Sequence, residues 1–326
     1  MIEEDFYLTG LDGHRFACTQ WRPEPANSAT PQASATVQIA HGMGEHRRRY
    51  KGLAEALTHQ GYAVFASDHR GHGDTATISP LGAMGTNGWR HTLSDMNYLA
   101  RFACSTYPGK PAILLGHSMG AALTQQYIGL YGDTLSAAIL SGSPGFMGIP
   151  QLLFGELVAR LEAVRLGQNV ASEFLQGMLF GKNNEAFASA NPNADEPPTS
   201  ADDVTGYEWL SKDRIEVAAY VADPLCGFVL VPESLAEMFR GMRQARSVDA
   251  VLAIPRKLPI YVFSGSDDPV HAQEANLDAL LSCYRSTGLE VDYKLYPEGR
   301  HEMLNETNRV EVVADLISWL ETSLNA

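Results

Sequence analysis

The sequence predicts an α/β protein with a mostly parallel central sheet and helices on both faces of it. Three observations lead to this prediction. Short apolar runs alternate with helical stretches from residue 36 to residue 140, the alternation stops between about 145 and 250, and it resumes from 258 onwards. Strands that alternate with helices are typical of parallel sheets. With 326 residues, 45% of them hydrophobic, the chain can bury a large core.

The chain is expected to open with an antiparallel pair of strands. The segments 6–8 and 16–21 flank the residues Leu11, Asp12 and Gly13, and Asp-Gly between short strand-like runs is a strong hairpin signal. The alternating series then follows, in which apolar periodicity and glycines separate helices from strands. Its expected strands are 36–40, 62–66, 112–115 and 137–140, and its expected helices are 50–60, 89–107 and 119–131.

The segment 145–250 is expected to be a helical insertion, because no strand pattern interrupts it. Its expected helices are 151–166, 173–180 and 234–243, and the Pro, Asn and acidic residues of 191–203 indicate a loop. Alternation resumes after the insertion. The expected elements are the strand 258–263, the helix 272–285, the strand 291–296 and the helix 310–324.

Charge and hydropathy exclude several classes of partner. Lys and Arg number 24 against 38 for Asp and Glu, which gives a net charge of −14. Such a surface repels phosphates, so we expect no nucleic acid and no anionic membrane as a partner. The most apolar run, 112–123, is interrupted by His117 and Ser118 and falls short of the roughly 18 residues of a membrane helix. We therefore expect no transmembrane segment and at most transient contact with a membrane surface.

The first residues and the cysteines indicate a reducing compartment. The start MIEED is acidic and lacks the basic and apolar regions of a signal peptide, so we expect a cytoplasmic location. The cysteines lie far apart and form no C-x-x-C pair, which is typical neither of a zinc site nor of a disulfide framework. We expect reduced, mostly buried thiols at Cys18, Cys104, Cys226 and Cys283.

Ser118 is the strongest candidate for a nucleophile. Residues 116–120, GHSMG, fit the pattern G-x-S-x-G and fall where an expected strand turns into an expected helix. In such a turn the serine stands on a strained bend above the sheet, and glycines are required where side chains would clash. The N–H of Met119 follows at a helix N-terminus, where it can stabilise an oxyanion. The alternative is a glycine-rich strand end in which Ser118 only caps the helix.

A base and an orienting acid are expected downstream, in the chain order Ser, Asp, His. Two carboxylates, Asp267 and Asp268, follow an expected strand. We favour Asp268, because Pro269 fixes the backbone directly after it, and we expect one of the two carboxylates to cap the next helix. His301 follows the last expected strand and is the expected base, whereas His271 is expected to begin a helix in contact with solvent.

Two further motifs end the first two parallel strands. Residues 41–45, HGMGE, form a glycine turn after the first of these strands, and residues 68–73, DHRGHG, follow the second. The second motif is expected to support the first or to contact a substrate. Their histidines and His117 are expected to pack or hydrogen-bond locally. The basic run 47–49, RRR, is expected to be a solvated helix start or to steer a negatively charged head group.

Together these motifs resemble the α/β-hydrolase superfamily, and within it the branch of monoacylglycerol lipases and lysophospholipases, also called serine aminopeptidase-like hydrolases. The resemblance covers nearly the whole chain. It rests on 41–46 with Arg49 and Tyr50, on 68–73, 116–120, 265–268 and 300–303, and on 223–226 in the insertion. It implies an α/β-hydrolase fold in which 1–144 and 251–326 form the core and 145–250 forms a helical cap over the active site.

The resemblance also implies roles for five residues. The family's nucleophile, acid and base fall on Ser118, Asp268 and His301, and its oxyanion donors fall on the N–H groups of Met43 and Met119. The acid of this family is the fourth residue of a Gly-x-x-Asp element, which again favours Asp268 over its neighbour.

Two departures from the family pattern bear on the substrate. Asp74 stands where the family often has Arg or Lys before Ser, and Arg47 and Arg48 replace smaller residues. Neither departure touches the five candidate residues.

The expected activity is the hydrolysis of esters of single-chain lipids, monoacylglycerols or lysophospholipids, through an acyl-enzyme on Ser118. The apolar segments 146–149, 152–154 and 178–180 can line an acyl-chain tunnel, although each residue can instead pack the core of the cap. The chemistry needs no metal and no organic cofactor, and the expected partner is a small lipid or ester. Two alternatives stay open, an aminopeptidase of the prolyl type with an acidic pocket for the substrate ammonium, and a ligand-binding member with little turnover.

Overall fold

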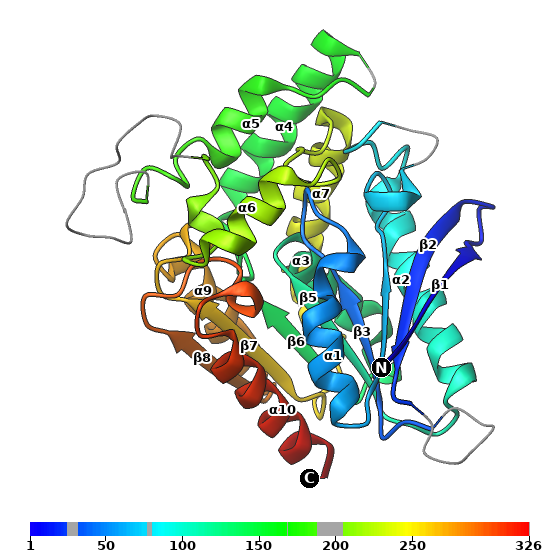
Figure 1. Ribbon diagram of the computed structural model, residues 1–326. Coiled ribbons are helices and arrows are strands. Elements are labelled where there is room, and N and C mark those ends of the chain that lie inside the picture. Colours follow the sequence, from blue (N-terminus) through cyan, green and yellow to red (C-terminus); the bar gives the residue numbers. More distant parts are fainter. Residues whose placement is uncertain (25–31, 77–79, 168, 188–204, 326) are drawn as a thin grey trace.

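A computed structural model describes residues 1–24, 32–76, 80–167, 169–187 and 205–325. The described part of the chain contains a central eight-stranded sheet with helices on both faces, which confirms the expected α/β class (Figure 1). The strands lie in the order β1-β2-β4-β3-β5-β6-β7-β8. Their bounds are β1 (Ile2–Thr9), β2 (Arg15–Arg22), β3 (Thr36–Ala40), β4 (Ala63–Ser67), β5 (Ala112–His117), β6 (Ala137–Ser141), β7 (Ile260–Gly265) and β8 (Val291–Tyr296).

The strands pair as the sequence pattern predicts. β1 and β2 form the antiparallel hairpin, with Leu8 opposite Phe16, and β2 also pairs antiparallel with β4. From β4 to β8 every neighbouring pair in the described sheet is parallel. Every residue of β3 to β7 is buried, because helices cover both faces of a parallel sheet.

Helices pack on the two faces of the sheet. Leu57 and Leu316 cover one face, where they join alternate strand residues such as Ile39. Leu123 and Leu281 lie in buried clusters on the other face. Full burial of one leucine contributes about 1.5–3 kcal/mol to the stability of the fold. Successive residues of a strand face opposite sides of the sheet, so each strand packs against the helices on both faces. These helices are α1 (Lys51–His59) and α10 (Arg309–Asn325) on the first face, and α2 (Gly88–Thr106), α3 (Met119–Tyr131) and α9 (Ala275–Ser286) on the second.

The described part of the chain has five α-helices between β6 and β7, and α4, α5 and α6 lie beyond the edge of the sheet where the parallel strands end (Figure 1). α4 and α7 pack closely, since a Cβ on Gly155 would lie 2.9 Å from the ring of Phe239. These helices are α4 (Ile149–Leu166), α5 (Glu173–Phe180), α6 (Arg214–Ala222), α7 (Pro232–Ala245) and α8 (Val248–Leu252).

The sequence pattern predicts α4, α5 and α7 but misses α6 and α8. α6 is short, and its start depends on Asp213, whose carboxylate accepts a hydrogen bond from the Ile215 N–H at 3.0 Å. The loop expected at 191–203 lies outside the described residues. The division of the chain at residues 145 and 250 stays a prediction.

The described helices and cysteines bear on two further expectations. None of the described helices is long and apolar enough to cross a membrane. All four cysteines are free, but the expectation of mostly buried thiols is wrong. Cys18 is buried, Cys226 and Cys283 are partly exposed, and Cys104 lies on the solvent side of α2.

The basic run 47–49 is not a solvated helix start. Arg47 is buried in a short 3₁₀ helix, where it forms ion pairs with Asp68 and Asp74. The Arg48 guanidinium lies 2.8 Å from the Asp74 carboxylate. Asp74 thus balances the arginines that replace smaller residues, so the two departures from the family pattern compensate each other. Because these charges are paired, the expected steering of an anionic head group by Arg47 and Arg48 is not supported either.

His271 is also wrongly expected in solvent. Its side chain is fully buried, and its Nε2–H donates to the Gly265 carbonyl at 2.9 Å. Its Nδ1 accepts the Glu274 N–H at 2.9 Å. His271 therefore fastens the turn after β7 to the end of that strand, and this turn carries Asp268.

Candidate active site

Ser118 stands in the turn between β5 and α3, with φ 53° and ψ −115°. Such a conformation costs a non-glycine residue about 1–3 kcal/mol, and it places the side chain above the sheet. A Cβ on Gly116 would lie 2.3 Å from the carbonyl oxygen of Gly120, and a Cβ on Gly120 would lie 2.0 Å from that of Ala40. The close approach of the backbone segments therefore explains both glycines of the motif.

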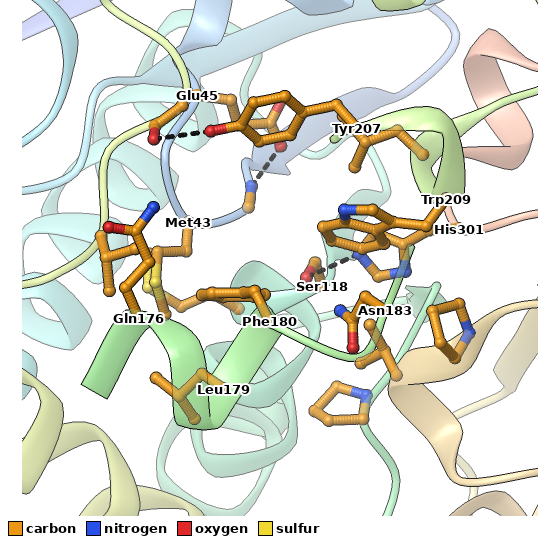
Figure 2. Close-up of a pocket in the computed structure, with 18 of the residues that line it drawn as sticks. Met43, Glu45, Ser118, Gln176, Leu179, Phe180, Asn183, Tyr207, Trp209 and His301 are labelled. Atoms are coloured by element: carbon orange, nitrogen blue, oxygen red, sulfur yellow. Dashed lines mark hydrogen bonds between the residues drawn. The ribbon is translucent and has the colours of Figure 1, made fainter. Parts of the chain in front are cut away.

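The structure brings Ser118, His301 and Asp268 together. The Ser118 Oγ points at the His301 imidazole (Figure 2) and lies 2.9 Å from its Nε2. The Nδ1 of His301 lies 2.9 Å from the Asp268 carboxylate. Asp268 also accepts hydrogen bonds from the Ser264 hydroxyl and the Val270 N–H, each at 2.9 Å. Both Asp268 and His301 are 2% exposed, so their interaction is shielded from solvent.

The buried pair shifts the pKa values of both partners. Burial works to lower the pKa of His301, but the Asp268 carboxylate outweighs it, so this pKa lies above its usual value. Burial works to raise the pKa of Asp268, but His301 outweighs it, so this pKa lies below its usual value. Asp267, by contrast, is exposed and accepts a hydrogen bond from the adjacent Ser266. The geometry therefore selects Asp268 as the partner of His301.

Met43 and Met119 line the same cavity as Ser118. Met119 is the first residue of α3, so its N–H has no partner within the helix. Met43 lies in the loop after β3, where the Nε2 of His41 accepts the N–H of His69 at 2.9 Å. The loop after β4 thus supports the loop that carries Met43, as the sequence predicts.

A cavity of about 660 Å³ opens above Ser118. Its wall is mostly apolar, with polar groups at a few places (Figure 2), and α5 and α7 contribute part of it. Its apolar lining includes Met147, Leu179, Phe180, Met238, Phe239 and Met242, and its polar lining includes Gln176, Asn183 and Tyr207. Other residues of the apolar segments expected to line a tunnel, such as Phe146 and Leu152, pack in buried clusters instead.

Residues 31–308 match the family model described as serine aminopeptidase, S33. The chain belongs to this family. It is 27% identical over 321 residues to a monoacylglycerol lipase of Mycolicibacterium smegmatis, covering 97% of this chain and 96% of that one. It is 26% identical over 331 residues to a monoglyceride lipase of Mus musculus, covering 98% and 91% of the two chains.

A solved structure adds to these relatives. A thermostable carboxyl esterase from Bacillus coagulans, in complex with glycerol, aligns with a TM-score of 0.84 at 26% identity over 99% of both chains. The comparisons confirm the α/β-hydrolase fold and the expected branch of the superfamily. The protein is a hydrolase of the esterase and lipase class.

Trp209 is a site residue of this S33-family hydrolase that the sequence pattern does not predict. Its ring lies 5.0 Å from the His301 ring, centroid to centroid, and stacks with Phe180 at 6.0 Å. Its carbonyl accepts the His301 N–H at 3.3 Å. A single aromatic residue outside any periodic segment carries no signal for such a role. Trp209 covers one face of the imidazole and keeps water from it.

His46, Asp223 and Cys226 are the described residues that come closest to a metal site in the hydrolase, with candidate ligand atoms within 4.8 Å of one another. His46 Nε2 is already bound to the Asp223 carboxylate at 2.9 Å. The other Asp223 oxygen accepts the Leu225 N–H, so Asp223 caps a turn. Burial raises the pKa of Cys226 to about 12, although the nearby Arg49 opposes it. This group is therefore a hydrogen-bonded histidine and carboxylate beside a neutral thiol, and it fits a metal poorly.

Buried neutral histidines make the hydrolase sensitive to acid. Burial lowers the pKa of His69 to about 3 and those of His72 and His117 to about 4, and it lowers that of His41 well below its usual value. In an unfolded chain these histidines bind protons near about pH 6.5, whereas in the folded chain they stay neutral to a much lower pH. They therefore cost the folded state no free energy above about pH 6.5, and an increasing amount as the pH falls towards about 4. Each histidine costs up to about 1.4 kcal/mol per pH unit in that window.

We therefore expect the free energy of unfolding to fall by about 5 kcal/mol per pH unit between pH 6 and pH 5, with carboxylates adding to the loss. Urea titrations at pH 7, 6 and 5 measure it. Replacing the exposed His59 with Gln leaves the slope unchanged in this experiment. A free energy of unfolding that stays constant from pH 7 to pH 5 contradicts the expectation.

Proposed function

We propose that the hydrolase cleaves esters of single-chain lipids through an acyl-enzyme on Ser118. The observation that carries the proposal is the chain of hydrogen bonds from Ser118 through His301 to Asp268 beneath an apolar cavity. His301 takes the hydroxyl proton while the Ser118 Oγ attacks the ester carbonyl, and Asp268 holds the imidazole tautomer and stabilises the imidazolium. The imidazolium then protonates the leaving alcohol. Water activated by His301 finally releases the fatty acid and restores Ser118.

In this proposal the oxygen that carries the negative charge of the tetrahedral intermediate accepts hydrogen bonds from the N–H groups of Met43 and Met119. Backbone donors need no particular side chain, which allows methionine at both positions. A donor of this kind typically contributes about 3 kcal/mol to the transition state. No step of this reaction requires a metal or an organic cofactor.

The preference for a single-chain lipid rests on the cavity and its surroundings. The methionine and aromatic side chains of its wall suit an alkyl chain better than a polar polymer. The outer face of α4, near the cavity, exposes a row of large apolar side chains, an arrangement that marks contact with an apolar phase. These residues are Ile149, Leu153, Phe154, Leu157 and Leu161. Relatives of the hydrolase are named monoacylglycerol lipases, which favours a monoacylglycerol over a lysophospholipid.

The description of the family as aminopeptidases makes a peptidase the second candidate. Such an enzyme needs a carboxylate that can hold the ammonium of its substrate. Two of the three carboxylates that line the cavity, Glu45 and Glu302, are bound to Arg49 at 2.7–2.8 Å, so their charge is largely neutralised within the protein. The third, Glu173, is exposed in the first turn of α5. The pairing of the first two favours the esterase.

Fatty-acid release from monoacylglycerols and lysophosphatidylcholines of matched chain length tests the proposal, with an aminoacyl nitroanilide as the peptidase probe. We expect the monoacylglycerol to give the highest kcat/KM and the nitroanilide to give no turnover. Faster release from the nitroanilide would replace the esterase by the peptidase. Turnover of a short soluble ester alone, with no release from either lipid, would remove the lipid assignment and keep the ester chemistry.

A further inference from the structure

A buried ion-pair network joins the loop after β3 to the loop after β8. Arg49 donates from Nη1 and Nη2 to the two carboxylate oxygens of Glu302, at 2.7 and 2.8 Å. Its Nη1 also donates to Glu45 at 2.8 Å. The side chains of Glu45, Arg49 and Glu302 are 4%, 10% and 6% exposed. One guanidinium therefore holds two buried carboxylates, and Arg49 and Glu302 are 253 positions apart in the sequence.

At one end of the network, Glu45 shapes the loop that carries Met43. Its Oε1 accepts the N–H of Gly42, and it also accepts the Tyr50 hydroxyl at 2.8 Å. Gly42 lies against the nucleophile, since a Cβ on it would lie 3.2 Å from the Cβ of Ser118. A displacement of Glu45 therefore moves Gly42 and, with it, the adjacent amide of Met43.

At the other end, Glu302 directly follows His301 in the chain. Its own N–H donates to the Leu210 carbonyl at 2.7 Å, and its side chain accepts the Asn305 amide at 2.9 Å. Two parallel hydrogen bonds between a guanidinium and a carboxylate fix orientation as well as distance. The bond to Arg49 therefore fixes the backbone from which the imidazole extends.

We infer that Arg49 is a positioning residue, which acts through Glu45 and Glu302 to hold the Met43 amide and the His301 imidazole in place around Ser118. Neither role requires Arg49 to touch the substrate. The inference rests on the proposed ester hydrolysis, because it assigns these groups their places in that reaction. Arg48, the residue directly before Arg49, has no part in the network, since it pairs with Asp5 and Asp74.

The network also places charge near His301. Two carboxylates share one guanidinium, and other titratable groups that face the network or the imidazole include Tyr50, His72, His117, Tyr220, Cys226 and Asp268. Burial lowers the pKa of His301, Asp268 opposes it most strongly, and Glu302 and Glu45 act in the same direction as Asp268. Burial likewise opposes ionisation of Glu302, but Arg49 brings the pKa of Glu302 to about 2, so it stays charged in any ordinary assay.

The variants Glu302→Gln and Arg49→Lys separate geometry from charge. Glu302→Gln removes a negative charge near the imidazolium, so the acid limb of kcat/KM moves to lower pH. Arg49→Lys keeps the charge but cannot form the two parallel bonds, so the acid limb stays in place. In both variants we expect kcat to fall about 10-fold to 100-fold with KM nearly unchanged, because small displacements of reacting groups cost this much. A short soluble nitrophenyl ester is the substrate.

Arg48→Gln is the matched control, and its kcat, KM and acid limb are expected to equal those of the wild type.

Titration of His301, followed through its imidazole proton resonances, gives the midpoint of its protonation without turnover of a substrate. A wild type that hydrolyses no ester would end the proposed function, while this titration would still test the network. If Glu302→Gln does not fold, Glu45→Gln removes the same charge from the other end. The inference would be overturned if the Glu→Gln variant that folds has the same kcat as the wild type and His301 titrates in it at the same pH.

Discussion

Ser118→Ala is expected to lower kcat for every ester substrate by at least about 10⁴-fold while leaving the fold intact. No other group can form the acyl bond in the proposed reaction, and such losses are typical when the nucleophile of a serine hydrolase is removed. The residual rate comes from binding and from the oxyanion donors. The hydroxyl is small and stands at the floor of the cavity, so its loss leaves no large void in the packed core.

Initial rates with a soluble nitrophenyl ester measure this effect, and thermal melting of the variant establishes that it folds. Ser105→Ala removes a hydroxyl from the exposed face of α2, where it donates to the Phe102 carbonyl outside the cavity lining, and is expected to keep full activity. A Ser118→Ala protein that melts normally and retains more than about a hundredth of the wild-type kcat would rule out the nucleophile.

Asp268→Asn is expected to lower kcat by about 10⁴-fold and to change its dependence on pH. The wild-type acid limb of kcat/KM lies above the ordinary imidazole pKa of about 6.5, because Asp268 raises the pKa of His301 and only neutral His301 can take the proton. An amide at position 268 no longer favours the imidazolium. The acid limb of the residual activity therefore moves to lower pH.

The chain offers a matched control for this prediction. Asp267 is adjacent, carries the same charge and is exposed, so Asp267→Asn is expected to change neither kcat nor the acid limb by more than about two-fold. Profiles of kcat/KM from pH 5 to pH 9 for the two variants decide between the carboxylates. A larger loss in Asp267→Asn than in Asp268→Asn would reverse the assignment.

The fold and the meeting of Ser118, His301 and Asp268 could be predicted because their signals are local. The motif 116–120 combines a strand, a turn and a helix within a few residues, and the geometry of that turn requires its glycines. The turn around Asp268 and the loop around His301 each follow a strand, and the carboxyl ends of parallel strands meet at one edge of a sheet.

What could not be predicted depends on partners far apart in the sequence. From the sequence alone Arg47 is expected at the surface, because charged residues are rarely buried unless they are paired. The structure buries it beside its partners Asp68 and Thr19. Trp209 covers His301 from a segment with no periodicity, and Arg49 meets Glu302 only in the folded chain. The sequence pattern therefore predicts which groups react, but not the residues that hold them in place.

The most direct measurement of the central claim is the covalent labelling of Ser118 by an alkyl nitrophenyl phosphonate, whose phosphorus resembles the tetrahedral intermediate. The reaction is expected to release a single equivalent of nitrophenol per chain and to leave the phosphonyl group on the peptide that contains Ser118. The Ser118→Ala variant, treated in the same way and expected to remain unlabelled, serves as the control. Labelling of a different residue, or equal labelling of Ser118→Ala, would contradict an acyl-enzyme on Ser118.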